Sequence, residues 1–231
     1  MSTDSVPVLL PKQFLFPVAF PCYRWTLRWQ DRSVPLESRY QLADMASLEP
    51  QKPHFVRWYA AWNPDGVFIT IQVTGKTQYP WCRPNRIDES DRVTILLDTR
   101  NVHTVHRANR YCHRFLFMPG GGGVRLDRPF TAWQPIHRAK DHPDPVPENV
   151  LRAAVRFGDP KHHPAENPND YQLDCWIPRT ALTGFDPMEH AALGFNAIVY
   201  DRELCVQSVG PSAPLPLDDD PSLWTTLELC D

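Results

Sequence analysis

The densest polar stretch of the chain spans residues 100–114 and combines imidazole, thiol and guanidinium groups. His103 and His106 have the spacing of two metal ligands on one loop, and His113 follows on the next expected strand. Zinc accepts imidazole and thiolate ligands, but Cys112 and His113 are strand neighbours and therefore point to opposite faces. Three interpretations stay open: a solvated basic rim, a clamp for a small polar ligand, and a metal site. The same stretch holds Arg100, Arg107, Asn109, Arg110 and Arg114.

Tryptophan is the second residue type with a chemical use, because the chain has eight of them. Trp81 lies in a proline-flanked segment without a periodic core pattern, so it is a candidate for an exposed stacking surface. Trp58 and Trp62 instead alternate with their neighbours along an expected strand, which predicts that they belong to the core.

The sequence lacks the local motifs of the common enzyme classes. It has no nucleophile elbow and no His-Glu-x-x-His motif. Paired catalytic carboxylates need only spatial proximity, however, and any two of the 27 acidic residues are free to meet. An enzyme that uses His103, His106 and His113 therefore stays open as the alternative to a binding protein.

Composition and charge argue against some classes of binding partner and some cellular locations. The net charge is −3, and no Lys/Arg run is long enough to follow a phosphate backbone, which argues against nucleic acid. The apolar stretch 6–20 is interrupted by prolines and Lys12, so we expect neither a signal peptide nor a membrane span. Six cysteines without a CxxC pair are expected to be reduced thiols. The sequence therefore predicts a cytoplasmic protein.

The elements that position these residues are predicted to be short strands. The chain contains 25 prolines, which disfavour long helices because each removes a backbone donor. Residues 55–73 show period-2 alternation on both sides of Asn63-Pro64-Asp65-Gly66, a pattern that predicts a β-hairpin. A short helix is expected only at 178–182, where Pro178 is suited to the first helical position. The other expected strands are 92–98, 111–118, 149–157, 170–177, 193–200, 203–209 and 223–229.

These features predict an all-β fold, an antiparallel β-sandwich of jelly-roll or immunoglobulin-like type with little helix. Residues 1–22 are expected to form a proline-rich N-terminal arm, and residues 23–231 a single sandwich domain. The segment 119–148 is expected to be a long Gly/Pro-rich loop.

Three ordered segments resemble the family 9 carbohydrate-binding modules and the wider group of DOMON-related domains. The resemblance extends from about residue 35 to the C-terminus. Its first segment is Trp62-Asn63-Pro64-Asp65-Gly66-Val67-Phe68-Ile69, continuing to Val73-Thr74-Gly75-Lys76. The second is Trp81 followed by Asp91-Arg92-Val93-Thr94-Ile95-Leu96-Leu97-Asp98-Thr99-Arg100. The third is Tyr171-Gln172-Leu173-Asp174-Cys175-Trp176-Ile177-Pro178, then Leu182, Leu193-Gly194-Phe195-Asn196 and Asp201.

The resemblance implies a non-catalytic module that holds a sugar between two tryptophans and carries structural calcium at the sandwich edge. Trp81 matches one tryptophan position; Trp133 and Trp176 compete for the other, and Trp133 is preferred. Arg100, His103 and Asn109 are the expected polar ligands of the sugar. Asp91, Asp98 and Asp201 match acidic positions of the motif, where calcium binding and backbone capping both fit.

We therefore expect a carbohydrate or another small polar ligand at one end of the sandwich. There the Trp81 loop, the 100–110 loop and the 119–148 loop are predicted to converge. Two alternatives to a sugar-binding or sugar-sensing module remain: the histidine-based enzyme above, and a structural or protein-interaction domain whose sugar site has decayed.

Overall fold

The computed structural model describes residues 18–26, 28–34, 36–43, 45, 54–210 and 216–231. Most of the expected N-terminal arm, residues 1–17, lies outside this described part. Among the described residues no helix is long and apolar enough to cross a membrane.

Strands dominate the described residues, and the helical elements there are short 3-10 turns. The predicted strands are present, and the predicted helical turn after Pro178 is one of the 3-10 turns. The strands are β1 (Ala19–Arg24), β2 (Val56–Asn63), β3 (Gly66–Val73), β4 (Arg92–Asp98), β5 (Cys112–Gly122), β6 (Arg128–Gln134), β7 (Arg152–Phe157), β8 (Tyr171–Pro178), β9 (Ala192–Asp201), β10 (Cys205–Ser208) and β11 (Thr225–Cys230). The 3-10 turns are η2 (Ser38–Tyr40), η4 (Pro84–Glu89), η5 (Arg179–Ala181) and η6 (Pro221–Leu223).

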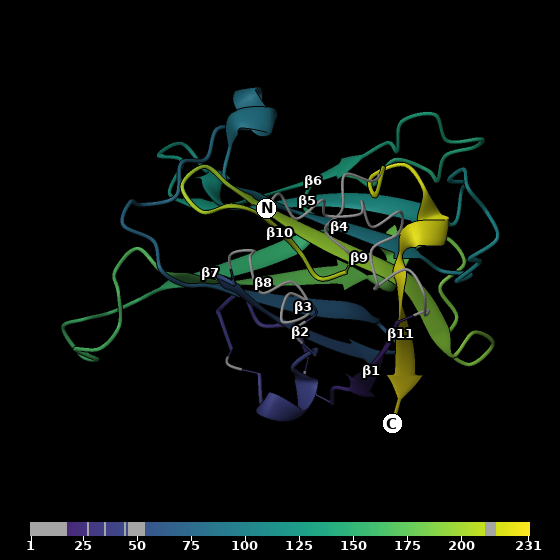
Figure 1. Cartoon of the computed structure of the whole chain (residues 1–231), viewed down its shortest axis with the longest axis horizontal. Coiled ribbons are helices and arrows are strands. Elements are labelled where there is room, and N and C mark those ends of the chain that lie inside the picture. The colour runs from purple at the N-terminus through teal and green to yellow at the C-terminus, as the bar shows by residue number, and fades with distance from the viewer. Residues whose placement is uncertain (1–17, 27, 35, 44, 46–53, 211–215) are drawn as a thin grey trace, which may run out of the picture.

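The strands form one hydrogen-bonded sheet in the order β6-β5-β4-β9-β11-β1-β2-β3-β8-β7, with β10 paired to β9. Figure 1 shows β4, β5, β6 and β9 on one side and β2, β3, β7 and β8 on the other. The end strands β6 and β7 also lie near each other, so the sheet is nearly closed into a barrel-like shape. The all-β prediction is confirmed, but the strands of the described residues form one sheet and not the two separate sheets of a sandwich. The pairing is also not purely antiparallel, because β1 runs parallel to both β11 and β2.

Two strands were not predicted. Residues 19–22, assigned to the proline-rich arm, form most of β1, and β6 occupies part of the segment expected to be a loop. Strand β5 also continues past Pro119 to Gly122, with a register shift between Met118 and Gly121. Pro119 is tolerated there because this bulge interrupts the regular hydrogen-bond ladder.

The β2–β3 hairpin forms where the alternation predicted it. The Asn63 side chain accepts a hydrogen bond from the Asp65 amide at 2.9 Å and closes the turn. Gly66 has a φ of 153°, and a Cβ at this position would lie 2.3 Å from the Ile177 carbonyl oxygen of β8. Glycine is therefore required for β3 to approach β8.

The core lies between the two sides of the sheet, where the apolar positions of each strand alternate inward. Trp58 and Trp62 belong to it, as predicted, together with Phe20 and Cys22 of β1. Residues 93, 95 and 97 of β4 also face this interior, so the intervening residues of β4 face outward. The outward face of β4 and of its neighbours β5 and β9 carries buried polar side chains.

Candidate functional site

Polar side chains occupy the middle of the outward face of β4, β5 and β9. Leu96 of β4 is paired with Arg114 on β5 and with Asn196 on β9. Thr94 lies two residues before Leu96 on the same face of β4. The register therefore groups Thr94, Arg114 and Asn196 on three adjacent strands.

Several polar atoms of this face are buried without a hydrogen-bond partner among the described residues. They are Thr94 Oγ1, Arg114 Nε and Asn196 Nδ2, joined by Asp218 Oδ1 from the segment before η6. Buried polar atoms in folded proteins are normally hydrogen-bonded, and leaving one unsatisfied costs about 1–3 kcal/mol. Each unsatisfied buried group in a folded protein needs an explanation, and a bound polar ligand or water that completes its hydrogen bonds is one.

Tyr200 links these atoms to the start of β4. Its hydroxyl donates to Asp218 Oδ2 at 3.2 Å, and the Arg92 guanidinium lies 3.9 Å from its ring centroid. Burial, together with the neighbouring Asp218 carboxylate, raises the pKa of Tyr200 to about 12. Thr94 and Asn196 are fully buried, whereas Arg114, Tyr200 and Asp218 are partly exposed. The edge of the cluster therefore reaches solvent, while the four unpartnered atoms themselves lie just beneath the surface.

Two apolar clusters flank the polar group on the same face. Towards the Asp98 end of β4 lie Leu96, Ala108, Cys112, Ile136 and Trp224. Towards the other side lie Cys82, Leu116 and Met118, with Ile87, Phe130 and Ala132 packed against them. Because Cys82 belongs to the second cluster, the loop that carries Trp81 is anchored on this face.

Trp81 lines a small cavity of about 200 Å³ together with Gln78, Tyr79, Arg202 and Glu203. The Trp81 side chain is half-buried, and the Arg202 guanidinium lies 4.5 Å from its ring centroid. Arg83 and Arg86 lie at 5.4 and 5.6 Å from the same ring. Trp81 thus lies at a polar cavity, and arginine side chains already contact its ring.

A buried cluster of charged side chains lies beside Trp81, and Lys76 and Asp91 of this cluster line the same cavity. Lys76 Nζ lies 2.5 Å from Asp201 Oδ2 and 3.4 Å from Asp91 Oδ2, and all three side chains are almost fully buried. Burial lowers the pKa of Lys76, but the hydrogen bond to Asp201 and the Asp91 charge outweigh it, so the pKa is raised overall. Asp91 also accepts hydrogen bonds from the Trp81 and Arg202 amides at 3.0 and 2.8 Å. Lys76 therefore fixes the position of the Trp81 loop through Asp91.

Asp91, Asp98 and Asp201, for which calcium binding and backbone capping were both expected to fit, lie in two separate places. Asp91 and Asp201 surround the Lys76 ammonium, which supplies the positive charge between them. Asp98 lies at the opposite end of β4, where its carboxylate accepts from the Arg100 and Val102 amides at 2.9 Å each. In the described part of the chain no group of three or more His, Cys, Asp or Glu is arranged to hold a metal.

The predicted convergence of the three loops is wrong. Asp98 pairs with Cys112, so β4 and β5 form an antiparallel pair and the loop between them lies at the far end of β4 from Trp81. There Arg100 lies 4.5 Å from the Tyr111 ring, and Asn109 Oδ1 accepts from the Tyr111 amide at 2.8 Å. His103 Nε2 lies 2.9 Å from Thr226 Oγ1. These residues stabilise their own loop and its contact with β11.

The histidines of the alternative metal site are also separated. His106 is exposed and contacts Asp220 at 3.3 Å and Ser222 at 2.9 Å. His113 is fully buried and stacks on Phe115 with the ring centroids 5.7 Å apart. The two side chains therefore lie in different environments, one at the surface and one in the core, and the histidine-based enzyme is not favoured.

Neither candidate for the second tryptophan lies opposite Trp81. Trp133 is on β6, paired with Phe115, and packs half-buried against the core. Trp176 is buried on the outer face of β8 with Trp25 and Phe68. Trp133 lies within the segment 119–148 that was expected to be a loop, but the structure places it on strand β6.

Sequence reasoning missed Thr94, Asn196 and Asp218 as site residues and counted Arg114 only as part of a basic stretch. A polar residue at an outward strand position is ordinary, so its type and spacing give no signal. The signal is the absence of a partner after burial, and that becomes visible only in three dimensions.

Comparisons with known proteins agree with the fold. No protein-family model and no curated protein matches the chain. A family 9 carbohydrate-binding module from Caldicellulosiruptor kristjanssonii, solved with cellotriose, matches with a TM-score of 0.55 at 10% identity, over 92% of this chain and 93% of that chain. The same kind of module solved with glucose matches with a TM-score of 0.55 at 10% identity, over 91% and 95% of the two chains. At this identity the similarity shows the fold, and the fold resembles that of the family 9 modules, as the ordered motifs predicted.

Proposed function

We propose that the protein is a non-catalytic carbohydrate-binding module whose sugar site is the outward face of β4, β5 and β9. The observation that carries the proposal is the group of buried, unpartnered atoms on Thr94, Arg114, Asn196 and Asp218. The fold supports it, because the similar modules were solved with glucose and cellotriose bound.

Sugar hydroxyls suit these atoms because each hydroxyl both donates and accepts a hydrogen bond. Arg114 and Asn196 offer donors, Asp218 offers an acceptor, and Thr94 offers both. Charged partners make the stronger bonds and give direction, which selects the arrangement of hydroxyl groups. Ordering costs consume much of the contact energy, so we expect dissociation constants between micromolar and millimolar, roughly −8 to −4 kcal/mol.

Arg114→Met tests this site directly. Methionine keeps the apolar stem but removes the guanidinium donors, so the affinity for the bound sugar should fall at least about tenfold, which corresponds to about 1.4 kcal/mol. The measurement is calorimetry with glucose, cellobiose and cellotriose, preceded by a glycan array. Arg125→Met is the matched control, since Arg125 is an exposed loop residue. A wild-type protein that binds no glycan, or an Arg114→Met variant that binds as the wild type does, contradicts the proposal.

Trp81 is expected to contribute as a stacking surface at the edge of the site. Trp81→Ala should weaken sugar binding while it leaves the melting temperature nearly unchanged, because the side chain is only half-buried and Arg202 can rotate away. The readouts are calorimetry for binding and thermal unfolding for stability. A variant that unfolds, or one that keeps full affinity, identifies Trp81 as a packing residue instead.

A further inference from the structure

A second polar surface lies on the opposite side of the molecule, across β2, β3, β8 and β7. Arg57 pairs with Gln72, Gln72 with Gln172, and Gln172 with Arg156. The four side chains therefore form one row on adjacent strands, all on the outward face. Neighbouring strands are about 4.8 Å apart, so three strand spacings separate the backbone positions of Arg57 and Arg156 by roughly 14 Å.

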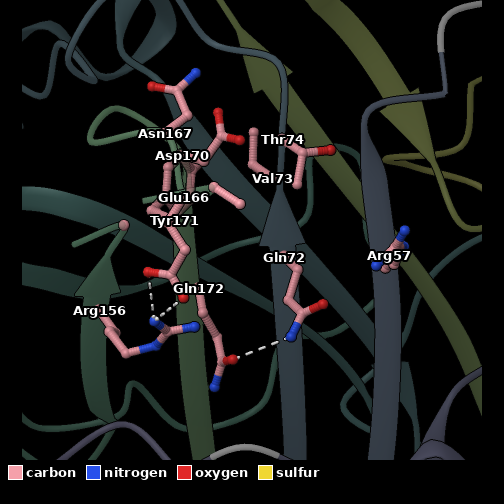
Figure 2. A pocket seen from close by; sticks show the side chains of 12 residues that line it. Arg57, Gln72, Val73, Thr74, Arg156, Glu166, Asn167, Asp170, Tyr171 and Gln172 are labelled. Atoms are coloured by element: carbon pink, nitrogen blue, oxygen red, sulfur yellow. Dashed lines mark hydrogen bonds and ion pairs between the residues drawn. The ribbon is translucent and has the colours of Figure 1, made fainter. Parts of the chain in front are cut away.

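This row is the floor of a cavity of about 310 Å³, shown in Figure 2. That volume is within the range of small-molecule sites, roughly 300–1,000 Å³. Thr74, Glu166, Asn167 and Asp170 also line it, and Figure 2 shows them above the Gln72–Gln172 pair. Segment 158–170 holds this wall in place, since the Asn167 side chain donates to the Lys76 carbonyl at 2.6 Å.

Part of the row is already hydrogen-bonded and therefore rigid. Gln72 Nε2 donates to Gln172 Oε1 at 3.1 Å, and Tyr59 donates its hydroxyl to Gln72 Oε1 at 3.2 Å. Arg156 Nη1 contacts both carboxylate oxygens of Glu166 at 3.2 Å. The positive charge of Arg156 is thus offset within the cavity.

Arg57 differs from the other members of the row. Within the described residues its guanidinium makes no hydrogen bond or ion pair, and the residue is exposed at one end of the cavity. One carboxylate oxygen of Asp170 accepts a hydrogen bond from the Lys76 amide at 2.9 Å. The second oxygen has no protein partner among the described residues. The Thr74 hydroxyl is likewise unpartnered there. The cavity therefore presents a cation at one end of the row and hydroxyl-binding groups along one side of the row.

We propose that this cavity is a second ligand site that binds a hydroxylated monocarboxylate, such as a uronic acid unit of an acidic oligosaccharide. The planar Arg57 guanidinium can donate two parallel hydrogen bonds to a carboxylate. Asp170, Thr74 and Gln72 would form hydrogen bonds with the hydroxyl groups of the same ligand. The carboxylates of Glu166 and Asp170 line the same cavity and disfavour a dianion such as phosphate. The site is independent of the neutral-sugar site proposed on β4, β5 and β9.

Two ligands that differ only at one carbon test the proposal: methyl β-glucuronide carries a carboxylate where methyl β-glucoside carries a hydroxymethyl group. In a two-dimensional NMR titration, the glucuronide should shift the side-chain amides of Gln72 and Gln172 with a millimolar dissociation constant. The glucoside should bind there at least tenfold more weakly. Arg57→Gln should weaken glucuronide binding at least tenfold, and raising the salt concentration should weaken it in the wild type.

The control variant is Arg125→Gln, which removes an exposed arginine elsewhere and should leave the titration unchanged. Equal binding of the two glycosides, an unchanged Arg57→Gln variant, or tighter binding of inorganic phosphate overturns the proposal. Arg114→Met separates the two sites, because it should affect neutral sugars without moving the glucuronide-dependent shifts of Gln72 and Gln172.

Discussion

Lys76→Met is expected to lower the free energy of unfolding by about 3–5 kcal/mol, the usual cost of breaking a buried ion pair from one side. The Lys76 side chain is 1% exposed, and those of Asp91 and Asp201 are 3% and 0% exposed. Methionine fills a similar volume but removes the ammonium. Two buried carboxylates then face each other without a cation, and either their repulsion or their protonation costs free energy.

Urea unfolding at pH 7 measures this loss, and Lys161→Met is the matched control because Lys161 is exposed. Adding Asp201→Asn to Lys76→Met should recover part of the stability, since it removes one of the uncompensated charges. A loss below about 1 kcal/mol for Lys76→Met, or no recovery in the double variant, contradicts the assigned role. The Trp81 loop should also become more mobile, because Asp91 holds the Trp81 amide.

The strands that sequence reasoning predicted are those whose inward and outward positions alternate locally. The β2–β3 hairpin is the clearest case, since both its period and its turn residues are contained in 18 consecutive positions, Val56–Val73. Strands β1 and β6 were missed because Pro21 and Pro129 interrupt their patterns. Strand β1 depends on parallel pairing with β11, about 200 residues away, and such pairing leaves no local signal.

The candidate sites were less predictable than the strands because they are built from distant residues. Asp91 and Asp201 were recognised as acidic positions, but the sequence does not show that Lys76, 125 residues before Asp201, lies between them. The row from Arg57 to Arg156 likewise requires the register of four strands. Trp81 was identified because a motif carries it, whereas Thr94 and Asn196 are recognisable only once burial leaves them unpartnered.

His113 should make the protein sensitive to acid. Burial in the core lowers the pKa of His113 from 6.5 to about 4, despite the opposing effect of the Thr183 backbone. The unfolded chain keeps the usual value near 6.5, so below this pH the unfolded state binds a proton that the folded state excludes. The contribution of His113 to the free energy of unfolding is therefore fully present above pH 6.5 and is lost as the pH falls towards 4.

Between pH 7 and pH 4.5 the His113 contribution to this loss should be roughly 2–3 kcal/mol. His113→Phe replaces the imidazole by a ring that stacks on Phe115 without titrating, so the difference in unfolding free energy between the two pH values should shrink by that amount. Urea unfolding at both pH values measures it, with His163→Phe as the control because His163 is exposed. Carboxylates titrate in the same range in both proteins, and their contribution cancels in the comparison. An unchanged pH dependence in His113→Phe would show that His113 is protonated or hydrated in the folded state, which contradicts its assignment as a neutral core residue.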